Sequence, residues 1–208
     1  TYGKQRGNET TQYSEHQAVA TWSPDSSKSV DYQEHPFCNN ANAAIRRKLW
    51  EEISYDETLT GLEDLDWAAR VIASGCRVAY VSEATVIHVH DETPVRTYNR
   101  YRREAIALKR IYPQENFTFY DFCRLFTANV LSDLYHAFQS QLFVKNIRPI
   151  LIFRLMQFWG TYRGYSHLAP VSKHLKQTFY YPRSLAKPTP PPANFLTQAI
   201  DYASHCPK

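Results

Sequence analysis

The sequence contains no long apolar run. Its 208 residues include no stretch of the roughly eighteen uncharged apolar positions that a membrane-spanning helix needs, and no segment has the pattern of a signal peptide. The four cysteines are widely scattered and show none of the paired spacings of a zinc site or a disulfide framework. We therefore expect reduced thiols and a cytoplasmic protein.

Acidic residues are missing from a long C-terminal stretch. Residues 134–200 hold eight Lys and Arg and no Asp or Glu, whereas residues 1–133 hold 15 basic and 19 acidic residues. This asymmetry indicates an anionic partner, either a membrane surface or a nucleic acid. We expect no nucleic acid, because no reader motif accompanies the basic residues and the aromatic residues follow helical spacing.

A helix that opens with acids is predicted from Glu63 to Gly75. Gly75 suits the left-handed residue that ends a helix, and the dipole favours acids in a first turn. The pair Glu63-Asp64 is therefore explained equally well by a solvated helix start and by catalysis. An apolar stripe recurs at helical spacing, with Glu63, Asp66, Trp67 and Arg70 on another side; its members are Leu65, Ala68, Ala69 and Ile72.

Two strands are predicted next, over residues 77–81 and 84–90, separated by Ser82-Glu83. Side chains alternate along a strand, so His88 and His90 share one face. His-x-His alone is a weak metal signal, and an edge strand with two polar residues explains it as well. A carboxylate and an imidazole that lie close together are a more specific signal of function than either feature alone, because the carboxylate could act as a base and the imidazole as a metal ligand.

The rest of the chain reads as α-rich. Asn39, Asn40 and Asn42 are typical of a turn. Pro149 suits the first turn of a helix that ends at Gly160. The other expected segments are a loop with at most a short helix over 7–35, a short strand and then a helix within 37–53, a basic helix over 97–112, a long helix over 119–143, and an extended Pro-rich run at 188–192.

Four blocks of this sequence, in this order and spacing, resemble the second half of the inverting family 2 glycosyltransferases of the GT-A fold. The blocks are residues 39–53, 55–57, 61–67 and 84–88. Residues 2–6 resemble the stretch before the acceptor loop in the bacterial cell-surface polysaccharide, rhamnosyltransferase-like branch. The resemblance implies an α/β fold class, with the C-terminal half of a GT-A domain over 1–112, a helical basic module over 113–187 and an extended tail over 188–208.

The resemblance also implies roles for single residues. Asp64 matches the general base that takes a proton from the acceptor hydroxyl, which is a poor nucleophile until a carboxylate accepts that proton. His88 matches the ligand of a divalent ion, Mn²⁺ or Mg²⁺, on the donor diphosphate, and His90 is a weaker candidate. Acceptor contacts are implied for Glu63, Trp67, Asn39 and Asn42.

The implied reaction moves a sugar from a nucleotide-sugar donor to a glycan or polyprenyl-linked acceptor with inversion. The family's first half, with its Asp-x-Asp motif, has no counterpart here, because no Asp-x-Asp occurs before Asp64. We therefore expect a fragment that is inactive as an isolated chain. The alternative is a non-catalytic peripheral membrane or interaction module.

The segment 119–187 combines basic residues with an apolar helix that is too short to span a bilayer. Trp159, Tyr162 and Tyr165 cluster near the end of that helix. Such segments lie in the bilayer interface, so we expect docking on an anionic membrane surface at the inner face of the cell membrane. Two helices packed on each other or on the catalytic part would give the same pattern.

Overall fold

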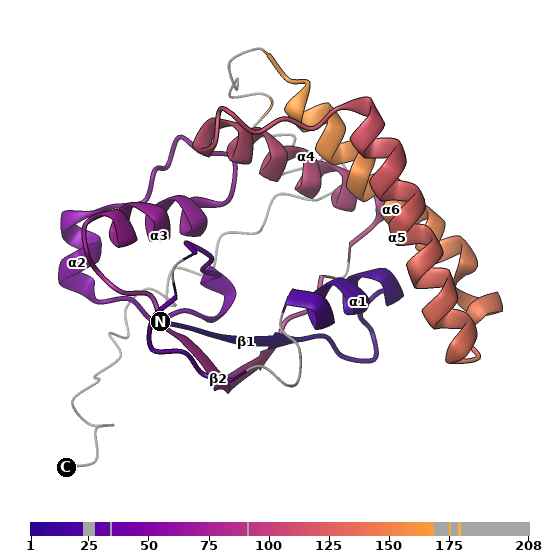
Figure 1. Cartoon of the computed structure of the whole chain (residues 1–208), viewed down its shortest axis with the longest axis horizontal. Helices are drawn as coiled ribbons and strands as arrows, with labels where there is room; N and C mark the ends of the chain where they lie inside the picture. The colour runs from indigo at the N-terminus through magenta and orange to yellow at the C-terminus, as the bar shows by residue number, and fades with distance from the viewer. Residues whose placement is uncertain (23–27, 34, 91, 169–174, 176–178, 180–208) are drawn as a thin grey trace, which may run out of the picture.

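The computed structural model describes residues 1–22, 28–33, 35–90, 92–168, 175 and 179. Figure 1 shows the strands with α2 and α3 at one end of the molecule and the hairpin of α5 and α6 at the other. The elements in chain order are β1 (Tyr2–Arg6), α1 (Tyr13–Trp22), the 3₁₀ turn η1 (Asn40–Asn42), α2 (Arg47–Glu52), α3 (Glu63–Ala73), β2 (Tyr80–Ile87), α4 (Pro94–Ile111), α5 (Phe119–Gln139) and α6 (Phe143–Tyr165).

The strands β1 and β2 form a two-stranded parallel sheet. Tyr2 pairs with Tyr80 and Arg6 with Ile87, and the register shifts between Gly3 and Gln5. A Cβ on Gly3 would lie 2.2 Å from the carbonyl oxygen of Ala84, so only glycine allows this approach. A small apolar core lies beside the sheet and consists of Tyr2, Cys38, Ala68 and Val78, with Ile72 and Tyr80 against it.

The prediction of two separate strands over 77–81 and 84–90 is wrong, and so is the extension of the second one to His90. Ser82 and Glu83 lie inside β2, which runs unbroken from Tyr80 to Ile87. The shift in register accommodates the polar pair, because β2 has four residues between Val81 and Val86 where β1 has only Lys4 between Gly3 and Gln5, and the pairs on both sides stay aligned. No strand is described within 37–53; Ala43 makes an isolated antiparallel bridge to Tyr2 instead.

The helix α3 begins and ends where the acids and Gly75 predicted, but it buries a different face. Its buried residues are Trp67, Ala68 and Val71, whereas Leu65, Ala69 and Ile72 are only half-buried. The indole decides this rotation, because Trp67 packs against the ring of Tyr55 and its Nε1 donates to the carbonyl oxygen of Ile53. Burying the largest apolar side chain outweighs the alignment of several small ones.

The helices α4 and α5 both pack along α6. Gly160 does not end α6, as the sequence predicted, but lies inside it and faces α4. A Cβ there would be 2.6 Å from the carbonyl oxygen of Tyr98, and one on Gly164 would be 2.5 Å from Cβ of Ala105. These glycines therefore serve close helix packing. As a result α4, which the prediction placed in the catalytic half, packs along a helix of the predicted C-terminal module.

The start of α6 also differs from the prediction. The helix begins at Phe143, and Pro149 lies within it rather than in its first turn. A tight turn after α5 makes this early start possible: Gln141 takes a left-handed conformation with φ of 59°, and the amide of Leu142 donates to the carbonyl oxygen of Ala137. The Pro-rich run 188–192 lies outside the described residues.

A buried ion pair joins three helices. Arg154 of α6 binds Asp133 of α5 through two bonds, Nε to Oδ2 at 2.8 Å and Nη2 to Oδ1 at 2.9 Å. Its Nη1 donates to Gln157, and Nη2 also reaches the carbonyl oxygen of Ser14 in α1 at 3.4 Å. Bidentate geometry of this kind fixes the helices relative to one another.

Cys38, Cys76 and Cys123 are free thiols, and Cys206 lies outside the described residues. Among the helices of the described segments, none has the length and apolarity needed to cross a membrane.

Candidate functional site

Asp64 lies in the first turn of α3, with its carboxylate held by two backbone amides. Oδ2 accepts a hydrogen bond from the amide of Asn40, and Oδ1 from the amide of Leu65, each at 2.9 Å. Burial raises the pKa of Asp64, the two amides oppose that shift, and the nearby Glu63 adds to it. A carboxylate with a raised pKa is a stronger base than an exposed one, while the amides fix its position.

Of the three asparagines near Asp64 in the fold, Asn40 makes the contact, and not Asn39 or Asn42, for which the resemblance implied acceptor contacts. The contact comes from the amide of Asn40, and the side chain of Asn40 accepts a hydrogen bond from the hydroxyl of Tyr55 at 2.9 Å. Asn39 caps η1 by accepting from the amide of Ala41. Asn42 donates from Nδ2 to the carbonyl oxygens of Lys4 and Ala84 at 3.1 and 2.7 Å. Asn39 therefore shapes the turn, as the structural interpretation of the cluster predicted, and Asn42 ties the turn to both strands.

Trp67 and Glu63 differ in exposure. Trp67 is 3% exposed and its indole N–H is satisfied by Ile53, so its position favours a packing role over an acceptor contact. Glu63 is half-buried next to Asp64, where it remains a candidate acceptor contact. Tyr55, which orients Asn40, is a residue of this site that the sequence did not reveal as functional.

His88 and His90 meet just beyond the end of β2. Their Nε2 atoms are 3.0 Å apart and their rings pack edge to face, which confirms that the two side chains share one side of the chain. Burial, together with the charge of Arg100, lowers the pKa of His88, and burial first and Arg100 second lower that of His90 to about 4. Both rings are thus neutral near pH 7, the form in which imidazole binds metals.

The histidine pair fits a divalent ion in part. Two neutral imidazole nitrogens this close can bind one ion from the same side. However, the described residues contain no group of three His, Cys, Asp or Glu side chains that could hold a metal. Further ligands would have to come from outside these described residues.

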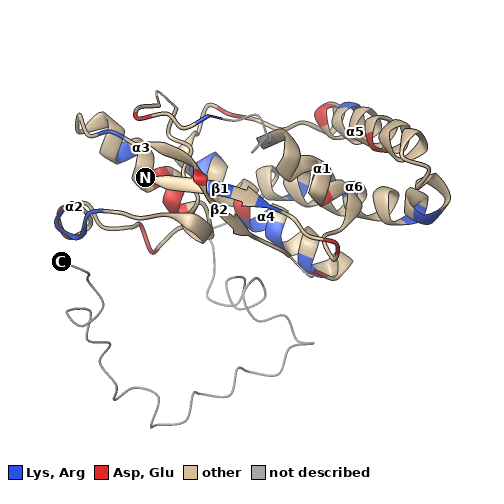
Figure 2. Ribbon diagram, turned by 90° about the horizontal axis from the view of Figure 1, so that it is seen from below, with Lys and Arg blue, Asp and Glu red and all other residues tan. Residues whose placement is uncertain are grey.

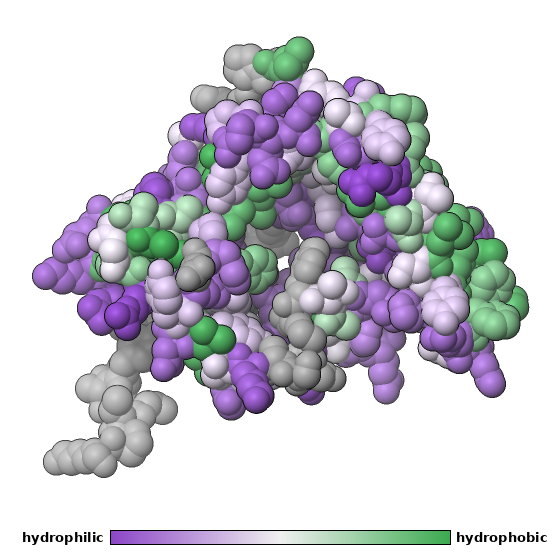
Figure 3. All heavy atoms as spheres, viewed as in Figure 1, coloured by the Kyte–Doolittle hydropathy of each residue, from purple (hydrophilic) through white to green (hydrophobic). Residues whose placement is uncertain are grey.

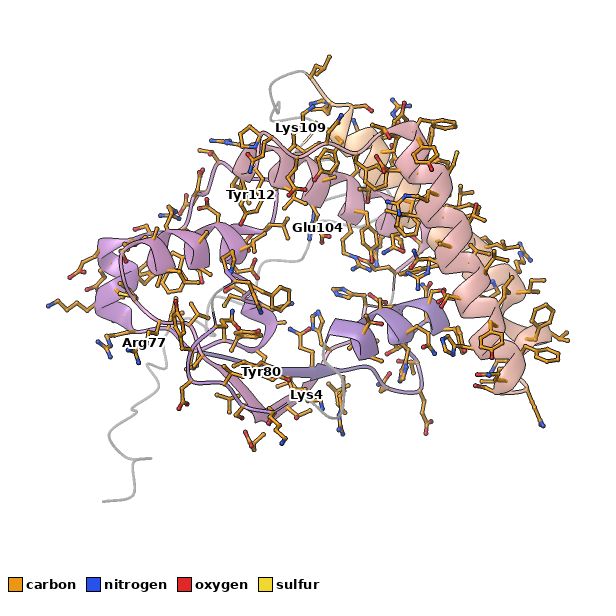
Figure 4. All side chains as sticks on the ribbon, in the orientation of Figure 1. Lys4, Arg77, Tyr80, Glu104, Lys109 and Tyr112 are labelled. Atoms are coloured by element: carbon orange, nitrogen blue, oxygen red, sulfur yellow. The ribbon has the colours of Figure 1, made fainter. Side chains whose placement is uncertain are left out.

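The helix α4 carries charged residues that interact with both Asp64 and the histidine pair. Arg100 forms ion pairs with Glu15 at 2.9 Å and with Glu92 at 2.7 Å, and its charge lowers the pKa of both histidines. Figure 4 shows Glu104 on the side of α4 that faces the strands. In the space-filling view the molecule is hollowed between α4 and the strands (Figure 3).

Glu104 is a second site residue that the sequence did not reveal. Its Cγ lies close to Gly61, since a Cβ on that glycine would be 3.8 Å away, and the hydroxyl of Thr60 is bonded to the carbonyl oxygen of Arg103 at 2.7 Å. Burial raises the pKa of Glu104 to about 6, with the charge of Asp64 contributing. Nothing local marks this glutamate, because it sits in a basic helical segment forty positions after Asp64.

Comparison with known proteins gives a partial answer. No protein-family profile matches the chain, and no solved structure matches it. Over 66 residues, 31% of the chain, it is 42% identical to the O-antigen chain rhamnosyltransferase RfbN of Salmonella typhimurium. Over a segment of the same length it is 39% identical to the O-antigen chain rhamnosyltransferase WbaN of Salmonella anatum.

The matched segment covers 21% of each of these relatives, so the chain spans about a fifth of their length. This similarity supports a relationship to glycosyltransferases of polysaccharide biosynthesis, the coarser part of what the sequence predicted. Membership of family 2 and the GT-A fold stay predictions. Over 66 residues, the chain is related to O-antigen rhamnosyltransferases.

Proposed function

We propose that this chain carries the acceptor-side part of an inverting, family 2 glycosyltransferase of the GT-A fold. The enzyme transfers a sugar from a nucleotide-sugar donor to a glycan or lipid-linked acceptor, with Asp64 as the general base. The observation that supports this most is the geometry of Asp64, a half-buried carboxylate fixed by the amides of Asn40 and Leu65. The partial similarity to two O-antigen rhamnosyltransferases supports the reaction class.

In this mechanism Asp64 accepts the proton of one acceptor hydroxyl. The hydroxyl oxygen forms the new bond to the anomeric carbon, and the bond from that carbon to the diphosphate breaks on the opposite face, which inverts the configuration. Each carboxylate oxygen of Asp64 keeps a free lone pair after binding one amide. Burial raises the pKa of Asp64, which makes its carboxylate a stronger base, and the two amides fix the orientation of that carboxylate.

A divalent ion, Mn²⁺ or Mg²⁺, would be held by His88, with His90 as its weaker partner. When bound, such an ion supplies positive charge for the departing diphosphate. The two imidazoles contribute by staying neutral near pH 7 and by holding their Nε2 atoms 3.0 Å apart. Arg100, clamped by Glu15 and Glu92, helps to keep them unprotonated.

The test of the base compares Asp64→Asn with Asp66→Asn in the enzyme at its natural length. Asp66 lies in the same turn of α3 but is engaged in an ion pair with Arg70 at 2.8 Å, so it serves as the matched control. We expect Asp64→Asn to lower kcat by roughly 10²–10⁴ with donor binding intact, and Asp66→Asn to leave kcat within a factor of about three. Turnover of Asp64→Asn near the wild-type rate would refute the assignment.

The test of the metal ligand compares His88→Ala with His90→Ala in a titration with Mn²⁺ in the presence of a nucleoside diphosphate. We expect His88→Ala to weaken metal and nucleotide binding together, and His90→Ala to weaken both less. The opposite order would exchange the two roles. Unchanged binding in both variants would show that the histidines hold no metal.

A further inference from the structure

The hairpin of α5 and α6 exposes apolar side chains that the fold leaves uncovered. Leu131, Tyr135 and Phe138 follow one another at helical spacing on α5, and Phe138 is 71% exposed. At the turn, Leu142 is exposed and Val144 is 89% exposed. Figure 3 shows an apolar patch over this end of the hairpin. We call these five residues the hairpin tip.

The hairpin tip is separate from the face by which α5 joins the rest of the molecule. The buried residues of α5 are Val130, Asp133 and Ala137, and Asp133 binds Arg154 of α6. A helix on the surface of a soluble domain normally presents polar residues on its outer face. Apolar patches that stay exposed on a folded protein mark interaction sites.

The charges around the hairpin tip have one sign. Lys145 and Arg148 lie in the first turns of α6, directly after Val144, and no acid occurs from residue 134 to residue 200. The nearest acid in the sequence, Asp133, is buried and paired with Arg154. Figure 2 shows Lys and Arg without Asp or Glu where α5 and α6 meet. An apolar surface bordered only by basic residues complements the interface of an anionic bilayer.

We propose that the hairpin tip docks on an anionic lipid surface. Phe138, Leu142 and Val144 enter the interface between headgroups and acyl chains, and Lys145 and Arg148 contact lipid phosphates. Tyr135 has the amphipathic ring that is favoured at this depth. The helices lie at the surface and do not span it. This inference is independent of the assignment of Asp64, and it confines the contact that the sequence predicted for residues 119–187 to one end of that segment.

The aromatic cluster at the other end of α6 has a different role. Trp159 lies 5.5 Å from the ring of Phe122 and 5.4 Å from that of Tyr162, measured between ring centroids. Phe119 and Phe122 of α5 both contact Tyr162. These rings therefore hold the two helices together. Phe119 and Tyr120 at this end are also exposed, but they lie beside the acid Asp121, whereas the exposed apolar residues at the turn are followed in the sequence by basic residues alone.

The experiment is co-sedimentation of the protein with vesicles of phosphatidylcholine alone and with 30% phosphatidylglycerol, across a salt series. We expect binding to the anionic vesicles that weakens with salt. The variant Phe138→Ser with Val144→Ser should lose binding at least tenfold at every salt concentration. Lys145→Gln with Arg148→Gln should lose about twenty- to thirtyfold at low salt only, since each basic residue near an anionic surface contributes about fivefold.

The matched control is Val95→Ser, which removes an exposed valine of α4 that does not belong to the hairpin tip. It should bind vesicles like the wild type, and circular dichroism should show that all variants are folded. Failure of the wild type to bind anionic vesicles at low salt would overturn the proposal. So would concentration-dependent dimers that the Phe138 and Val144 substitutions abolish, since the hairpin tip would then join two copies of the chain.

Discussion

Removing the carboxylate of Asp133 would leave the guanidinium of Arg154 charged and buried. The two side chains are only 4% and 5% exposed, and both of their hydrogen bonds are shorter than 3 Å. The substitution Asp133→Ala leaves Arg154 with Gln157 and a distant carbonyl oxygen as its remaining partners. Breaking a buried pair from one side costs about 3–5 kcal/mol of the free energy of unfolding.

For a domain of this size each kcal/mol lowers Tm by roughly 2–4 °C, so Asp133→Ala should lower it by about 6–20 °C. Urea unfolding followed by circular dichroism gives the free energy directly. The double variant Asp133→Leu with Arg154→Met should recover most of the loss, because it removes both charges and keeps the volume. The cost therefore comes from the orphaned charge and not from the missing contact.

The control is Glu51→Gln, which breaks the ion pair of Glu51 with Arg47 on the surface of α2. Those side chains are 52% and 88% exposed, and exposed pairs of this spacing contribute about 0.3–0.5 kcal/mol. If Asp133→Ala costs no more than this control, the pair does not hold α1, α5 and α6 together as argued. The same conclusion would follow if the double variant were as unstable as the single one.

Two further predictions concern α4. Burial raises the pKa of Glu104 from 4.5 to about 6, so the stability of the wild type falls as the pH rises from about 4.5 through 6. Glu104→Gln should therefore stabilise the protein by up to about 2 kcal/mol at pH 7.5 and by almost nothing at pH 4.5. Equal effects at the two pH values in urea unfolding would contradict this. Gly160→Ala should destabilise the protein by about 1–3 kcal/mol, because its Cβ would lie 2.6 Å from the carbonyl oxygen of Tyr98. This cost exceeds the gain from the higher helix propensity of alanine. A more stable variant in the same assay would show that α4 and α6 can separate at no cost.

The sequence predicted most helices well and their ends less well. The pattern of apolar residues and the acids at Glu63 and Asp64 placed α3, and the basic segment before Pro113 placed α4. The errors share one cause. Glycine often ends a helix and proline often begins one. In this fold, however, α4 packs too close to Gly160 for a larger side chain, and the turn at Gln141 lets α6 begin before Pro149. The local conformational preference of a residue is overridden where packing against another element contributes more stabilising free energy.

The candidate site shows the same division. The rings of His88 and His90 lie on one side, as the alternation of a strand predicted, although β2 ends at Ile87, before either histidine. That Asn40, rather than Asn39 or Asn42, would bind Asp64 could not be seen, since the bond uses a backbone amide that every residue possesses.

The sequence by itself determined where the chemistry-bearing residues stand along the chain: an acid pair at a helix start, two imidazoles two positions apart, and a basic section without acids. Tertiary structure alone decided which of them face one another. It turned Trp67 into the core, brought Glu104 beside Gly61, paired Asp133 with Arg154, and left Phe138 and Val144 uncovered. The physical reason is that periodicity records only which face of an element is apolar, whereas the partner of that face depends on segments far away in the chain.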